Sequence, residues 1–122
     1  MGSSAEVMDR FSAPTRAWFE ASFASATPAQ RGAWQAISHG EHALVVAPSG
    51  SGKTLAAFLA ALDSFVHRPS GGATRVLYIS SLKALGVDVE RNLRAPLAGI
   101  ESAALGLGVD FVPPSVGLRS GD

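Results

Sequence analysis

Apolar residues follow two kinds of pattern along this chain, and each kind predicts a different secondary structure. Apolar positions recur at helical spacing over 14–23 and again between Thr27 and Gly40, which predicts two amino-terminal helices. Two shorter runs, 42–47 and 75–79, are apolar without polar alternation, a pattern typical of parallel strands that are covered on both faces. The chain is therefore expected to combine helices with buried strands.

Each apolar run leads into another stretch with a helical pattern. Residues 55–62 are apolar nearly all round and rich in strong helix formers, and 82–93 carry an apolar stripe. A third strand is expected at 116–118. Alternating strands and helices predict an α/β fold, in which helices flank a parallel β-sheet and right-handed crossovers join the strands. A sheet of only three strands leaves an apolar edge, so we expect the chain to be poorly soluble.

One ordered domain is expected, beginning near Phe11 and covering residues 11–122. Residues 1–10 contain Glu6 and Asp9 and no apolar core segment, so they predict a disordered amino terminus and do not resemble a secretory signal. No apolar run approaches the roughly 20 residues of a membrane span. We therefore expect a cytoplasmic protein without a membrane partner.

The composition excludes several classes of function. Of the 122 residues, 47% are hydrophobic and 16% are charged, which suits a chain that buries a core. Ten basic residues balance ten acidic ones, so any contact with nucleic acid must come from the local placement of Lys and Arg. The absence of cysteine excludes disulfides, thiolate metal sites and cysteine nucleophiles.

Residues 47–54 read Ala-Pro-Ser-Gly-Ser-Gly-Lys-Thr and lie between an apolar run and a helical pattern. Small residues let successive backbone N–H groups face a phosphate, a lysine reaches the terminal phosphates, and a hydroxyl holds Mg²⁺. Ala47 replaces the usual first glycine of this motif. We predict a phosphate-binding loop in which Lys53 and Thr54 are the catalytic residues and Thr54 is the metal ligand. Its binding residues are Pro48, Ser49, Gly50, Ser51, Gly52, Lys53 and Thr54.

Upstream, Thr27-Pro28-Ala29-Gln30 has two interpretations. Thr27 and Gln30 have the spacing of a capping box at the start of a helix. The Gln30 amide can also donate and accept a hydrogen bond at once, which suits the edge of adenine. The residues alone leave both interpretations open.

Three stretches, 27–30, 47–54 and 80–85, together resemble superfamily 2 helicases of the DEAD/DEAH kind. Four stretches are especially similar to the large helicase-related, or Lhr-like, family: residues 15–19, 82–85, 87–93 and 116–122. The resemblance covers nearly the whole chain from Phe11 onward. It implies the first part of an amino-terminal RecA-like P-loop NTPase domain, truncated before the acidic DEAD/DEAH motif.

The resemblance also implies roles for single residues. Gln30 would read adenine while Thr27 shapes the turn, and Phe11 is the nearest aromatic residue that could pack on the base. Ser81 replaces the proline usual in relatives, and the alternative for Lys83 is an ordinary solvated lysine at a helix start. The residues implied to contact single-stranded nucleic acid, DNA rather than RNA, are Ser80, Ser81, Lys83 and Arg119.

The parent protein implied by this family is an ATP-dependent helicase with Mg²⁺ as cofactor and a role in DNA repair. Hydrolysis there needs an acidic pair and an arginine from a second domain, and this chain supplies neither. The chain is therefore expected to bind ATP without hydrolysing it, and to need the remainder of the helicase for turnover. Two alternatives stay open: another P-loop NTPase, such as a kinase or transporter ATPase, and a fragment that binds nucleotide or nucleic acid without hydrolysis.

Overall fold

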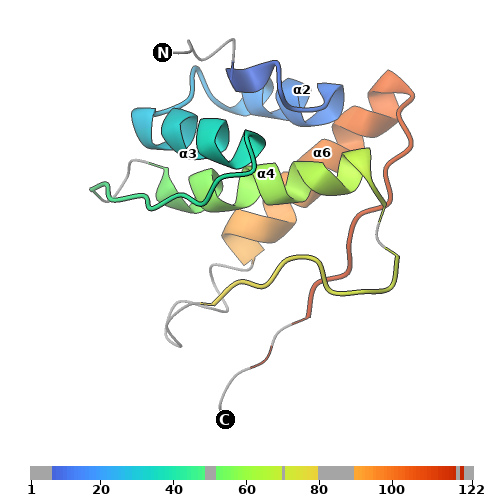
Figure 1. Ribbon diagram of the computed structural model, residues 1–122. Helices are drawn as coiled ribbons and strands as arrows, with labels where there is room; N and C mark the ends of the chain where they lie inside the picture. Colours follow the sequence, from blue (N-terminus) through green and yellow to red (C-terminus); the bar gives the residue numbers. More distant parts are fainter. Residues whose placement is uncertain (1–6, 49–51, 70, 80–89, 118, 120–122) are drawn as a thin grey trace.

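The computed structural model describes residues 7–48, 52–69, 71–79, 90–117 and 119. Within these ranges every regular element is helical (Figure 1). In chain order they are α2 (Ala13–Ser22), α3 (Pro28–Ser38), α4 (Lys53–His67), the π-helical turn η2 (Glu90–Arg94) and α6 (Ala95–Leu107).

The two amino-terminal helices begin where local chemistry predicts. Pro14 lies in the first turn of α2, where its missing N–H costs nothing. At the start of α3, the Gln30 N–H donates to Thr27 Oγ1 over 3.2 Å, and the Thr27 N–H donates to Gln30 Oε1 over 3.0 Å. This reciprocal pair is a capping box, so the helical interpretation of Thr27 and Gln30 is confirmed.

The predicted parallel sheet is wrong for the part of the chain that the structure describes. Residues 42–47 and 75–79 are extended, but neither is a β-strand. Most of their apolar side chains face solvent instead of lying between helices, with Leu44 91% and Ile79 82% exposed. A strand exists only when a second strand accepts and donates its backbone hydrogen bonds, and an apolar pattern does not identify that partner. The described fold is therefore all-helical, and the α/β prediction is corrected.

The elements after residue 80 also differ in part from those that the sequence pattern predicts. Most of the helix expected over 82–93 lies outside the described residues, as does part of the expected strand 116–118, whose Val116 and Gly117 are not in a strand. The turn η2 leads directly into α6, which has Pro96 in its first turn and ends at Gly108 in a left-handed conformation. None of the described helices is long and apolar enough to span a bilayer.

The core lies where α3 packs on α4 and α2 packs on α6. Trp34 of α3 is buried and meets the ring edges of Phe11 and Phe19 at centroid distances of 5.1 and 5.5 Å. Leu59 of α4 and Ile100 of α6 are completely buried in the same cluster. Aromatic pairs in this perpendicular geometry add to the stabilisation that burial alone provides.

Two features join the amino-terminal part of the chain to this core. Val7 and Met8, which fall within the tail expected over residues 1–10, belong to the buried cluster. At the crossing of α2 and α6, a Cβ atom on Gly99 would lie 2.1 Å from Cδ1 of Trp18. The two helices therefore approach closely only because residue 99 has no side chain.

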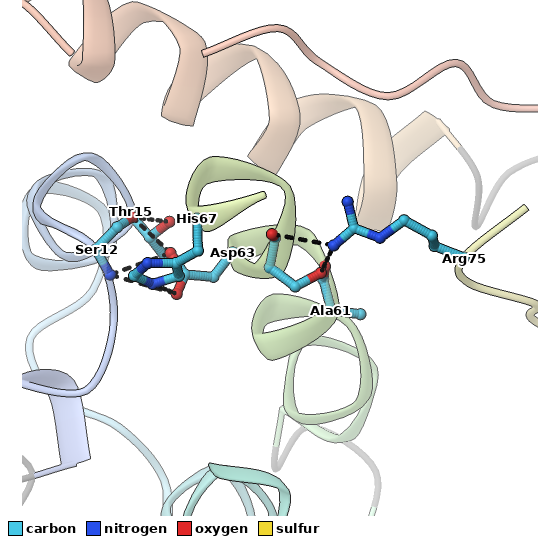
Figure 2. A network of polar contacts seen from close by, with 7 residues as sticks. Ser12, Thr15, Ala61, Asp63, His67 and Arg75 are labelled. Atoms are coloured by element: carbon cyan, nitrogen blue, oxygen red, sulfur yellow. Dashed lines mark hydrogen bonds and ion pairs between the residues drawn. The ribbon is translucent and has the colours of Figure 1, made fainter. Parts of the chain in front are cut away.

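A buried carboxylate on α4 holds the start of α2 (Figure 2). Asp63 accepts hydrogen bonds from the Ser12 N–H at 3.1 Å and from the Ser12 hydroxyl at 2.5 Å. Nε2 of His67, one turn later on α4, lies 3.2 Å from the same carboxylate. Ser12 is the N-cap of α2 and makes no side-chain capping bond, although its hydroxyl also donates to Thr15 Oγ1 of the same helix over 3.2 Å. Asp63 therefore supplies a negative charge to this helix end from a different helix.

Candidate nucleotide-binding site

Gln30 and Gly52, which belong to two separate predicted motifs, are in direct contact. The Gln30 side chain is only 4% exposed, and its Nε2 donates to the Gly52 carbonyl oxygen over 3.3 Å. Gly52 has a positive φ of 79°, and a Cβ there would lie 2.2 Å from Gln30 Nε2. Glycine is needed at this position for its backbone conformation and for the space that the amide occupies.

The first turn of α4 is suited to an anion. The helix begins directly after Gly52, its N-cap makes no side-chain hydrogen bond, and its first turn contains no acidic residue. The amino terminus of a helix carries a partial positive charge and N–H groups that lack partners within the helix. The predicted phosphate ligand, Lys53, and the predicted metal ligand, Thr54, are the first two residues of α4. The side chain of Lys53 is exposed, and that of Thr54 is half-buried.

Lys53 also borders an open cavity of about 510 Å³. Its other walls come from α3, from the extended segment 41–45 and from the first half of α4. Apolar side chains predominate beside the lysine, while Glu41 and His42 supply polar atoms. The lining residues are Ala33, Ile37, Glu41, His42, Ala43, Val45, Lys53, Ala56 and Ala57.

The structure brings together part of the predicted site. Thr27, Gln30, Gly52, Lys53 and Thr54 lie on the facing ends of α3 and α4 or directly before α4. Pro48 and Arg119 are described and exposed but belong to no helix. The predicted residues that lie outside the described part of the chain are Ser49, Gly50, Ser51, Ser80, Ser81 and Lys83.

Phe11 does not offer its ring to a base in this structure. Its side chain is 8% exposed and packs against Trp34 in the core. The hydrogen bond between Gln30 and Gly52 could not be predicted from the sequence either, because spacing along the chain does not say which residues meet. The structural role of Asp63 could have been suspected from the sequence, because it is an acidic residue inside an otherwise apolar helical stretch.

Comparison with known proteins identifies the family. Residues 27–111 match the family model of the DEAD/DEAH box helicases. The chain belongs to the DEAD/DEAH box helicase family. Among its relatives are the Lhr helicase/probable uracil glycosylase of Mycolicibacterium smegmatis and the Lhr helicase/uracil glycosylase of Escherichia coli. The first is 57% identical over 97% of this chain, and the second is 48% identical over 93% of it.

A solved structure supports the same relationship for this DEAD/DEAH box helicase chain. The Mycobacterium smegmatis helicase Lhr, bound to ssDNA and AMP-PNP, matches 95% of the chain with a TM-score of 0.84 and 58% identity. The resemblance to Lhr-like helicases is thus confirmed. The chain spans 8% of the length of each of the two bacterial relatives and 15% of the chain in that structure.

Proposed function

We propose that this chain binds ATP with Mg²⁺ as the ATP-binding portion of a helicase or translocase that acts on single-stranded DNA. The observation that carries the proposal is the hydrogen bond from Gln30 Nε2 to the Gly52 carbonyl oxygen. It joins the candidate reader of the base to the end of the candidate phosphate loop. A site for a nucleoside triphosphate needs these two functions close to each other.

The hydrogen bonds of Gln30 leave it able to read a base. A side-chain amide has two N–H donors and an oxygen with two lone pairs. In this structure Nε2 donates to Gly52, and Oε1 accepts from the Thr27 N–H. Toward the described residues, one donor and one acceptor of this amide therefore remain, which is the pair that the edge of adenine requires.

The phosphates would lie at the amino terminus of α4. There the Lys53 ammonium group would balance the charge of the terminal phosphates, and the Thr54 hydroxyl would hold Mg²⁺. Backbone N–H groups of the predicted loop over residues 47–54 would complete the cradle. When bound, Mg²⁺ neutralises charge on the phosphate oxygens.

The proposal assigns ATP hydrolysis to residues of the longer helicase. The acidic pair and the arginine that this chemistry requires have no counterpart among the residues proposed here. In the same proposal, Ser80, Ser81, Lys83 and Arg119 contact the DNA backbone, and DNA repair is the process served. The Lhr structure that contains ssDNA and AMP-PNP supports both ligand classes.

Removing the Lys53 charge tests the proposal. We expect Lys53→Ala to weaken ATP binding at least about a hundredfold, because a charged contact to phosphate is among the strongest hydrogen bonds in proteins. Isothermal titration calorimetry measures the affinity. Arg68→Ala is the matched control, because Arg68 is an exposed cation directly after the opposite end of α4. Equal affinities for wild type and Lys53→Ala would remove Lys53 from the site.

A further inference from the structure

The peptide group that joins Ala26 to Thr27 is held on both of its polar sides. Nη1 of Arg31 donates to the Ala26 carbonyl oxygen over 2.7 Å. The N–H of Thr27, which belongs to the same peptide group, donates to Gln30 Oε1 over 3.0 Å. Both side chains come from the first turn of α3, so two neighbouring residues fix the orientation of one peptide group directly before the helix.

The charge of Arg31 strengthens this arrangement. A hydrogen bond from a guanidinium group is roughly twice as strong as one between neutral groups. It also polarises the peptide group that accepts it, which makes the N–H on the opposite side a better donor. Ala26 is only 2% exposed, so its carbonyl oxygen is unfavourable without a donor. If the guanidinium group were lost, we expect the peptide group to change its orientation.

The orientation of this peptide group determines the orientation of the Gln30 amide. The Thr27 N–H can only donate, so it faces Oε1, and the Gly52 carbonyl oxygen can only accept, so it faces Nε2. Turning the amide over would place two donors together at one end and two acceptors together at the other. The amide therefore presents its N–H and its oxygen in one fixed order as long as the Thr27 N–H keeps its direction.

A fixed order of donor and acceptor distinguishes adenine from guanine. Adenine exposes the acceptor N7 beside the donor N6, whereas guanine exposes two acceptors, N7 and O6. An amide that presents one N–H and its oxygen to the base matches adenine, and its oxygen repels O6 of guanine. An amide that is free to turn can instead direct both N–H groups toward guanine. Selection of adenine therefore requires that the amide be held in place.

We propose that Arg31 is a positioning residue that sets the preference of this site for ATP over GTP. The inference rests on the proposed function, because it requires Gln30 to read the base. Arg31 acts through the peptide group between Ala26 and Thr27, and it contacts neither the base nor the phosphates. It contributes to the choice of nucleotide by restricting the Gln30 amide to the orientation that suits adenine.

The test compares two nucleotide analogues that are not hydrolysed. The full gene product that contains residues 1–122 is titrated with AMP-PNP and with GMP-PNP in the presence of Mg²⁺ by isothermal titration calorimetry, and the ratio of the two affinities is measured. Arg31→Met keeps an apolar stem and removes the guanidinium group. We expect the ratio to fall about fivefold, the value of one hydrogen bond, because AMP-PNP binds more weakly while GMP-PNP does not.

Three further variants separate positioning from loss of structure or charge. Arg31→Lys keeps a cation that can donate to the Ala26 carbonyl oxygen, and its ratio is expected to stay within about twofold of wild type. Arg16→Met removes a partly exposed arginine of α2, and its ratio is expected to equal that of wild type. Adding Arg31→Met to Gln30→Glu is expected to lower the ratio no further, because glutamate has no N–H group to position.

Several outcomes would overturn the role of Arg31. A wild-type ratio in Arg31→Met is one, and a ratio in Arg31→Lys as low as that in Arg31→Met is another. Equal losses of affinity for both analogues indicate a phosphate contact or a general structural role. A further fall when Arg31→Met is added to Gln30→Glu shows that Arg31 acts independently of the amide. Arg31→Gln, which is also uncharged, replaces Arg31→Met if the latter loses its helical circular dichroism.

The behaviour of wild type distinguishes this inference from the proposed function. Wild type that binds AMP-PNP and GMP-PNP equally well overturns the reading of adenine by Gln30, and with it the role of Arg31, but leaves ATP binding standing. Wild type that binds neither analogue overturns the proposed function itself.

Discussion

At the scale of single residues, Gln30 shows that one amide can serve two purposes. It caps α3 through Oε1 and contacts the end of the phosphate loop through Nε2. The two interpretations of Thr27 and Gln30 that the sequence left open are therefore compatible. The capping box is confirmed, and the reading of adenine stays a prediction that uses the remaining donor and acceptor of the same amide.

Replacing Gln30 by glutamate separates these two purposes. Gln30→Glu keeps the oxygen that accepts from the Thr27 N–H but loses both N–H donors, so α3 is expected to remain helical. We expect the preference for ATP over GTP to fall about fivefold, the value of one hydrogen bond of about 1 kcal/mol. Competition binding with the two nucleotides measures this preference, and circular dichroism checks the helix. Unchanged discrimination would leave Gln30 as a helix cap only.

At the scale of elements, the sequence predicts helices well because their signals are local. The predicted starts of α2 and α3 are within one residue of the observed ones, since a Pro or a capping Thr acts on the turn beside it. Segments 42–47 and 75–79 were predicted as strands from equally clear apolar patterns, but strand formation depends on a partner that those residues do not specify. At the candidate site, too, local features could be predicted from the sequence and contacts between distant residues could not. The loop residues were recognisable, whereas their contact with Gln30 depends on how α3 packs on α4.

Asp63 supports an element-scale prediction about α2. Asp63→Asn removes the charge and one of the two acceptor oxygens that hold Ser12, which leaves partly buried donors less well satisfied at a cost of about 1 kcal/mol. We expect amide hydrogens of α2 to exchange faster in this variant, as measured by mass spectrometry.

Asp9→Asn provides the control for this experiment. Asp9 is 75% exposed, and its carboxylate lies 3.5 Å from Arg16 of α2. An exposed ion pair contributes little to stability, so exchange in α2 is expected to stay near the wild-type rate. Similar rates in wild type and Asp63→Asn would show that α2 does not depend on the buried carboxylate.

At the scale of the whole molecule, we expect the apolar side chains that no described element covers to determine how the chain behaves in solution. Leu44 and Val46 in one extended segment, and Leu77 and Ile79 in the other, are each at least 79% exposed. Exposed apolar residues on extended backbone favour association between molecules. The poor solubility expected from the sequence therefore stays a prediction, although its cause is exposed extended segments and not the edge of a sheet.

Making these segments more polar is expected to reduce association. In the double variant Leu44→Thr and Leu77→Thr, we expect light scattering at a given concentration to fall severalfold, without a lower unfolding temperature, because neither side chain contributes to the core. Leu105→Thr serves as the control, since Leu105 is 83% exposed on α6, away from both segments. An equal fall in Leu105→Thr would mean that exposure alone, and not the extended segments, determines association.

The close approach of α2 and α6 restricts which substitutions this protein can accept during evolution. Because a Cβ at residue 99 would overlap the ring of Trp18, substitution of Gly99 is tolerated only after the indole has been replaced by a smaller side chain. Replacing Trp18 first leaves a cavity, which is less harmful than the overlap with a rigid ring that a change at Gly99 alone would cause. Positions 18 and 99 are therefore expected to change together among descendants of this sequence, with the change at 18 coming first.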